Sequence, residues 1–260
     1  MWNREPTRIQ SSWFILWSFI VAIILFPFRT LIGLFQKDFL KGWKPVQEAS
    51  SMLFAAKATT FLCLLLIVSY IVVILAGVEH HFVMRPGDLV QETAYRVVTH
   101  LFFHASWTHL LGNLIVLFGV GRIVERFFGP GWLLSMFIGF GAVAGALTNS
   151  VEMIQGVVQG SVGASAAISG LAVISLLRSP FSLTISPPLV LPIFLVVPAY
   201  IVSDLTLLGT NTNVGHMAHI FGTVAGLAFA IGTAGRTYVW KRLGWILLLF
   251  LCILGVQLFI

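Results

Sequence analysis

The sequence predicts an all-α fold, a polytopic membrane helical bundle. Hydrophobic residues make up 58% of the 260 residues and charged residues only 9%, and the mean hydropathy is +0.98. Soluble domains carry about 25% charged residues. The lipid interior offers no water to backbone N–H and C=O groups, so apolar runs of ~20 residues in such a chain are expected to be helices.

Seven apolar runs are long enough to be transmembrane helices. They are residues 52–77, 107–127, 131–149, 162–178, 184–203, 214–233 and 240–260. We expect residues 52–234 to form one domain, a six-helix core. Residues 235–260 then add a C-terminal transmembrane helix.

Residues 1–51 hold an eighth apolar run at 13–26, followed by a basic linker. Pro27 and Arg29 interrupt this run. Three interpretations stay open: a spanning helix, a helix lying in the interface, and an uncleaved signal anchor. No cleavage site of the A-x-A type follows the run, so we expect it to remain in the mature chain. The two cysteines both fall inside apolar helices and indicate no disulfide framework.

Basic residues predict the orientation of the bundle. If the helices alternate, one side holds Lys37, Lys41, Lys44, Arg122, Arg126, Arg178, Arg236, Lys241 and Arg242. Loops on the other side hold Arg85, Arg96 and most of the acids. By the positive-inside rule the first side is cytoplasmic. This topology accounts for the net charge of +6, so no nucleic-acid partner is expected.

Polar residues gather near the non-cytoplasmic ends of three predicted helices. His109 and Asn113 are four residues apart, so both project from one face of the helix at 107–127. Taken alone, such residues are more often interhelical hydrogen-bonding groups than catalytic ones. The same structural role is the simplest one for His219.

The surroundings of His219 favour a second interpretation. Gly215, Gly222 and Gly226 form a stripe of small residues along its helix, which lets a neighbouring backbone approach closely. The stretch GASAAISGL, residues 163–171, supplies a matching stripe on another helix. Close approach would bring Ser165 within reach of His219. A serine hydroxyl becomes a useful nucleophile only when an adjacent base takes its proton.

Five motifs, in order, resemble the rhomboid family of intramembrane serine proteases over residues 52–234. They are YR at 95–96, HASWTHLLGN at 104–113, GRIVERFFG at 121–129, GASAAISG at 163–170 and AHIFGTVAG at 218–226. Each motif is weak alone, because glycine patterns are common in membrane helices. Their number and order make the resemblance specific.

The resemblance implies a role for each matching residue. Ser165 matches the nucleophile and His219 the general base, as a Ser-His dyad without a third acid. His109 and Asn113 match the side chains of the oxyanion hole. The matching positions with structural roles are Arg96, Glu125, Gly163, Gly222 and Gly226. The chemistry agrees, because peptide hydrolysis needs a base for the serine proton and donors for the developing oxyanion.

One residue departs from the family pattern. Ala166 follows Ser165, where the family has glycine. Its methyl group either fits within a slightly wider helix contact or pushes Ser165 and His219 apart. Ser169, four residues from Ser165, is expected to be a packing hydroxyl.

The predicted function is that of an intramembrane serine endopeptidase, which hydrolyses peptide bonds in or near transmembrane segments of other membrane proteins. Its partners are then these substrates and the lipid bilayer, and its location is the plasma membrane. No cofactor or metal is expected, because the sequence has no H-E-x-x-H motif. The alternative is a catalytically inactive rhomboid-like protein that binds membrane proteins. Inactive relatives usually lose the serine or the histidine, and this chain has both.

Overall fold

The computed structural model describes Trp2 and residues 12–35, 44–157, 160–186, 189–210 and 215–257. The helices are α1 (Ser12–Phe35), α2 (Lys44–Ala55), α3 (Lys57–Ala76), α4 (Arg96–Thr99), α5 (Trp107–Phe128), α6 (Pro130–Gln155), α7 (Ser165–Arg178), α8 (Ile193–Thr206), α9 (His216–Ala234) and α10 (Arg236–Gln257). Short 3-10 turns lie at η2 (Glu79–His81), η3 (Asp88–Val90) and η4 (His100–Phe102). An antiparallel hairpin joins β1 (Leu183–Ser186) to β2 (Leu189–Pro192).

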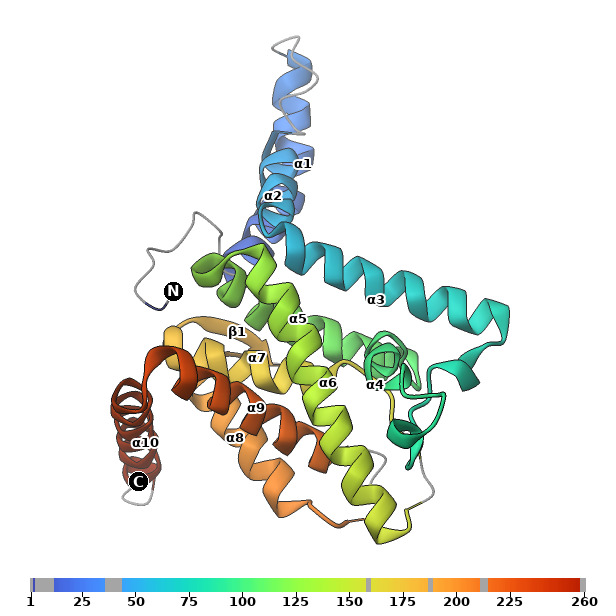
Figure 1. Cartoon of the computed structure of the whole chain (residues 1–260). Coiled ribbons are helices and arrows are strands. Elements are labelled where there is room, and N and C mark those ends of the chain that lie inside the picture. The colour runs from blue at the N-terminus through green and yellow to red at the C-terminus, as the bar shows by residue number, and fades with distance from the viewer. Residues whose placement is uncertain are drawn as a thin grey trace.

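Helix α7 is the centre of the bundle. It packs against α5, α6, α8 and α9 (Figure 1). Almost every side chain from Ala166 to Leu177 is buried, whether apolar or small. A helix that is apolar on all sides and covered by protein is a core element, so the first residue of α7 is held by neighbours on several sides.

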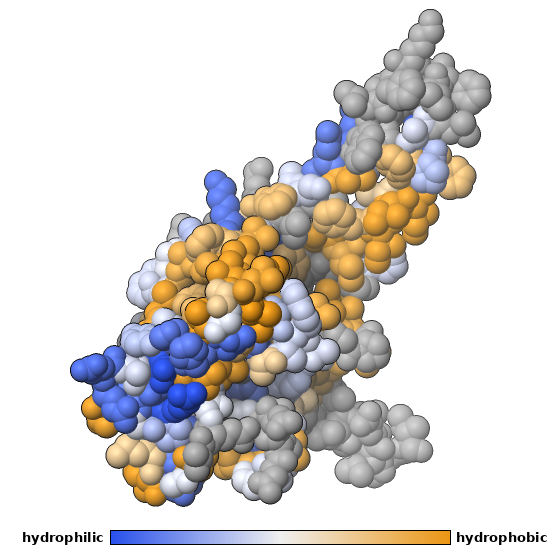
Figure 2. Space-filling model, turned by 90° about the vertical axis from the view of Figure 1, so that its right-hand side faces the viewer, coloured by the Kyte–Doolittle hydropathy of each residue, from blue (hydrophilic) through white to orange (hydrophobic). Residues whose placement is uncertain are grey.

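The predicted all-α membrane bundle is confirmed. Among the residues that the structure describes, four helices are long and apolar enough to cross a membrane, namely α3, α5, α6 and α9. Their outer faces carry exposed large hydrophobic side chains, such as Leu64, Val68 and Leu75 on α3. Figure 2 shows a broad hydrophobic surface beside a separate hydrophilic patch. Contiguous apolar surface of this kind suits lipid as the surrounding medium.

The expected helix at 52–77 is wrong at its start. Residues 44–55 form the separate helix α2, and the backbone leaves helical geometry at Ala56 before α3 begins at Lys57. The Glu125 carboxylate on α5 accepts hydrogen bonds from the backbone N–H groups of Ala58 and Thr59 at 3.0 and 2.8 Å. The first N–H groups of a helix have no partner within the helix, so a side chain distant in sequence caps this start.

The expected helix at 184–203 is also wrong over its first half. The hairpin of β1 and β2 occupies most of residues 183–192, and α8 begins only at Ile193. The sequence carries prolines at 187, 188 and 192. Proline lacks a backbone N–H and clashes with the preceding helical turn, so the apolar run cannot continue as one helix.

Three smaller differences concern element ends. The helix expected at 162–178 begins at Ser165. The apolar run at 13–26 belongs to a helix, α1, that continues through Pro27. Residues 240–257 of the last apolar run belong to α10, which begins earlier, at Arg236; residues 258–260 of that run lie outside the described residues.

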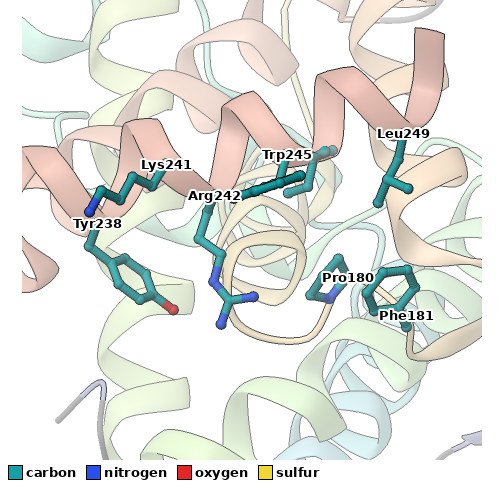
Figure 3. Close-up of a pocket in the computed structure, with 8 residues that line it drawn as sticks. Pro180, Phe181, Tyr238, Lys241, Arg242, Trp245 and Leu249 are labelled. Carbon is teal, nitrogen blue, oxygen red and sulfur yellow. The ribbon is translucent and has the colours of Figure 1, made fainter. Parts of the chain in front are cut away.

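Helix α10 contacts the bundle near the C-terminal end of α7. A pocket of about 470 Å³ lies between them. Figure 3 shows Trp245 and Leu249 of α10 beside Pro180 and Phe181. The Tyr238 hydroxyl donates to the Leu177 carbonyl at 3.4 Å. None of the residues expected to be catalytic lines this pocket. That α10 spans the membrane stays a prediction.

Candidate active site

The segment before α7 is fixed to the chain between α3 and α5. Ser161 and Met84 exchange two backbone hydrogen bonds, of 2.8 and 3.0 Å. The Gly163 N–H donates to the His100 carbonyl at 2.9 Å, and the backbone there is left-handed, with φ +116°. Only glycine adopts such a conformation at low cost. The turn that leads into Ser165 is thereby held in one position.

Helices α7 and α9 touch backbone to backbone at two glycines. A Cβ built on Gly222 would overlap the carbonyl oxygen of Ala166, and one on Gly226 would lie 2.5 Å from the carbonyl oxygen of Gly170. Because Ser165 directly precedes Ala166 and His219 lies one helical turn before Gly222, the two residues lie at matching levels of adjacent helices. Ser165 and His219 are both partly exposed, unlike the rest of this contact.

The methyl group of Ala166 is accommodated. Ala166 is only 3% exposed and belongs to the regular helix α7. The groups of Ala166 nearest to Gly222 are its backbone atoms. The extra methyl group therefore does not set the spacing of the two helices at this point.

His109 and Asn113 lie on α5, and His109 faces the turn before α7. The His109 ring covers Gly163, since a Cβ built there would lie 2.8 Å from Cε1 and 3.0 Å from Nε2 of the ring. Ser106 caps α5 by accepting the His109 N–H at 3.1 Å. Asn113 is buried one turn further along, and its amide donates to the His109 carbonyl at 3.0 Å. That bond uses one of the two amide hydrogens, which leaves a second donor.

Asp204 is a site residue that the sequence analysis did not identify. It lies near the end of α8, and its Oδ1 is 3.0 Å from Nδ1 of His219 and 2.8 Å from Nδ1 of His216. The signal in the sequence was its position at the end of an apolar run, where an acid is costly and usually functional.

The described residues include one group of potential metal ligands, formed by Asp204, His216 and His219. Their donor atoms lie within 4.8 Å of one another. An ionised carboxylate only accepts hydrogen bonds, so two Nδ1–H groups satisfy Asp204 as they stand. The arrangement of Asp204, His216 and His219 therefore needs no ion to explain it.

Arg96 and Asp88 form a buried ion pair of 3.1 Å in the loop between α3 and α5. Asp88 also accepts the Arg85 N–H at 2.7 Å and the Thr93 hydroxyl at 2.7 Å. Burial alone would raise the pKa of Asp88, but these hydrogen bonds and the Arg96 charge outweigh it and lower the pKa. The Asn149 amide of α6 holds the same loop, at the Arg85 carbonyl and the Gly87 N–H.

Two further histidines support the turn before Ser165. His100 is buried, and its Nδ1 lies 2.8 Å from the Arg96 carbonyl; burial lowers its pKa. His104 is fully buried and accepts the Ala164 N–H at Nε2, with a long distance of 3.5 Å. Burial first, and then the charge of nearby His109, lower the pKa of His104 to about 3. Both rings are therefore neutral at physiological pH.

Comparisons with known proteins identify the family of this chain. The Rhomboid domain family matches residues 91–236, more than half of the chain. Over 134 residues the chain is 31% identical to the putative rhomboid protease YdcA of Bacillus subtilis (strain 168), covering 51% of this chain and 63% of that protein. Over 85 residues it is 41% identical to Rhomboid-like protein 11, chloroplastic, of Arabidopsis thaliana, covering 32% of this chain and 29% of that protein.

The chain thus spans less than two thirds of the length of these relatives. The family match nevertheless includes all of α5, α6, α7, α8 and α9, together with the segment that carries Arg96. This integral membrane protein belongs to the rhomboid family.

Proposed function

We propose that the protein is an intramembrane serine protease with Ser165 as nucleophile and His219 as general base. The observation that carries the proposal is the start of α7. Ser165 is its first residue, and it lies beside the first turn of α9 and the His109 face of α5. Nucleophile, base and oxyanion donors thus come from three helices packed around one point.

The length of α7 supports a site below the membrane surface. Its 14 residues extend ~21 Å, less than the ~30 Å thickness of the hydrocarbon core. With Arg178 at the cytoplasmic boundary, Ser165 lies ~10 Å inside the opposite boundary by these dimensions. The turn before Ser165 and the loop containing Arg96 and Asp88 lie on that side, where water can reach the nucleophile.

The residues can perform each step of peptide hydrolysis. His219 Nε2 takes the Ser165 proton as the oxygen attacks the scissile carbonyl carbon, and the resulting oxyanion receives hydrogen bonds from His109, Asn113 and the Ser165 N–H. The protonated His219 then gives its proton to the leaving amine. Water, deprotonated by the same imidazole, hydrolyses the acyl-enzyme.

The start of α7 adds to oxyanion stabilisation. N–H groups in the first turn of a helix have no acceptor within the helix, and the helix dipole places partial positive charge there. Arg96, Glu125, Gly163, Gly222 and Gly226 support the site without touching the substrate. Glu125 fixes α3, and the three glycines permit the close packing of α7.

The substrates are transmembrane segments of other proteins that reach α7 from the bilayer, and the membrane is the plasma membrane. Family members without activity form the competing class, as binding proteins for membrane segments. The presence of Ser165 and His219 on adjacent helices favours the protease.

A fluorophosphonate probe tests the proposal directly. The protein in detergent should label covalently and cleave a transmembrane substrate, while Ser165→Ala and His219→Ala should abolish both. Ser169→Ala and His80→Ala are the matched controls, because one removes a neighbouring hydroxyl and the other an exposed imidazole. A folded parent protein that neither labels nor cleaves would leave the binding protein as the better assignment.

A further inference from the structure

We propose that Asp204 is a positioning residue for His219, so that the site works as a Ser165–His219–Asp204 triad. This inference rests on the proposed function. The family resemblance implies a dyad without an acid, and no acid adjoins His219 in the sequence. The carboxylate comes from α8, a different helix.

The hydrogen bond fixes the tautomer of His219. Oδ1 of Asp204 lies 3.0 Å from Nδ1 of His219, and an ionised carboxylate only accepts. The Nδ1 atom therefore carries the proton. This leaves a lone pair on Nε2, the nitrogen that must accept the Ser165 proton. The alternative tautomer would present an N–H to the serine and could not act as a base.

The environment of the pair makes the bond effective. The side chains of Asp204 and His219 are only 14% and 17% exposed, so water competes weakly for either partner. A partly buried carboxylate is costly without a partner. When His219 takes the Ser165 proton, the adjacent negative charge stabilises the imidazolium while the Asp204 carboxylate itself remains unprotonated.

His216 holds the carboxylate in place. Its Nδ1 lies 2.8 Å from the same Oδ1 of Asp204, and its side chain is 8% exposed. His216 and His219 are three residues apart on the first turn of α9, so both rings face α8. Two N–H donors from one helical turn restrict the rotation of the Asp204 side chain.

The competing explanation is that the cluster only fastens α8 to α9. The neighbours of Asp204 near the end of α8, Ser203, Leu205 and Thr206, are all exposed, so Asp204 supplies the inward contact at this end of the helix. A fastening role predicts a lower melting temperature on mutation. It predicts no specific change in how activity depends on pH, because the basicity of His219 would be unaffected.

The decisive experiment measures steady-state cleavage of a transmembrane substrate by the full chain between pH 5 and 9. Titratable groups around His219 are Asp204 on α8, His216 on α9 and His109 on α5. Asp204→Asn should lower kcat by about 100-fold or more and leave KM nearly unchanged. The acidic limb of its pH–rate profile should move to lower pH, because the negative charge beside the imidazolium is removed.

Two variants complete the design. Asp204→Glu keeps the acceptor and should recover part of kcat with the acidic limb close to its original position. Glu92→Gln removes an exposed carboxylate from the same side of the molecule and should behave like the parent. The proposal is overturned if Asp204→Asn keeps at least a third of the parental kcat. It is also overturned if kcat falls with an unmoved acidic limb and a lowered melting temperature, which is the fastening result.

A readout that needs no proteolysis separates this inference from the proposed function. In the Ser165→Ala protein labelled with ¹⁵N-histidine, the His219 spectrum should show a protonated Nδ1 and a bare Nε2. Adding Asp204→Asn should shift that tautomer population. A parent that shows this tautomer yet never labels with the fluorophosphonate would sink the protease assignment alone. An unchanged His219 spectrum in the Asp204→Asn protein would sink the positioning role alone.

Discussion

Gly222 of α9 lies directly against the backbone carbonyl of Ala166 in α7, with no space for a Cβ at residue 222. The contact continues one turn further along, where Gly226 meets Gly170. Where the backbones of two helices touch, short side chains from both helices can reach each other. The proposed Ser165–His219 pairing depends on it, because both residues lie within one turn of the contact.

Replacing Gly222 by alanine should therefore separate α7 from α9. We expect Gly222→Ala to lower the stability by about 1–3 kcal/mol or more, as overpacking does, and to abolish cleavage. Thermal unfolding in detergent and the substrate assay measure the two effects. Gly232→Ala is the control, because Gly232 lies in the same helix with open space around it. That change should be neutral or stabilising by up to ~1 kcal/mol. Equal behaviour of the two variants would contradict the close helix contact.

Each oxyanion donor should contribute to turnover. His109→Ala and Asn113→Ala remove the two proposed side-chain donors, and loss of one such donor costs about 100-fold or more in kcat. Melting temperatures and access of the fluorophosphonate probe should remain largely intact. If either variant cleaves at the parental rate, the substituted residue is not an oxyanion donor.

The Glu125 carboxylate should be needed for the start of α3. It accepts three hydrogen bonds, from the Ala58 and Thr59 N–H groups and the Thr59 hydroxyl. In Glu125→Gln an amide NH₂ must face donors, and a buried unsatisfied group costs about 1–3 kcal/mol. The melting temperature should fall by several degrees, whereas Glu48→Gln on the exposed face of α2 should leave it unchanged. No difference between the two would show that Glu125 is dispensable as a cap.

Mild acid should destabilise the protein through His104. Its pKa is about 3 when folded and ~6.5 when unfolded. Between these values the unfolded chain binds a proton that the folded protein does not. Stability should thus fall as pH falls below ~6.5, by up to ~1.4 kcal/mol per pH unit.

Melting temperatures in detergent from pH 7.5 to 5 test the role of His104. His104→Gln should show a weaker decline with acid than the parent, and His100, whose pKa is also lowered by burial, should account for part of the remainder. Asp88 does not affect this measurement. Its pKa is lowered in the folded protein, so its contribution to stability is lost only when the pH falls below the ordinary pKa range of aspartate. An identical decline in the variant and the parent would reject the assignment to His104.

Features that depend on the overall composition or on the spacing of nearby residues were predictable from the sequence. The mean hydropathy of +0.98 and the apolar runs determined an all-α membrane bundle, because lipid leaves the backbone few alternatives to a helix. The i,i+4 spacing of His109 and Asn113 placed them on one helix face, as local geometry requires. The stripe of Gly222 and Gly226 predicted a close helix neighbour, which the structure identifies as α7.

Features that depend on which residues meet across the bundle were decided only by the tertiary structure. The break at Ala56 follows from Glu125, distant along the chain. The prolines in the apolar run at 184–203 rule out one continuous helix, but only the fold shows that its first half pairs as a hairpin. The contact of Asp204 with His219 joins α8 to α9, and no spacing rule links two residues on separate helices. Hydropathy patterns report the solvent that each segment faces. Hydrogen-bond partners between segments depend on helix rotation and depth, which are set when all the helices pack at once.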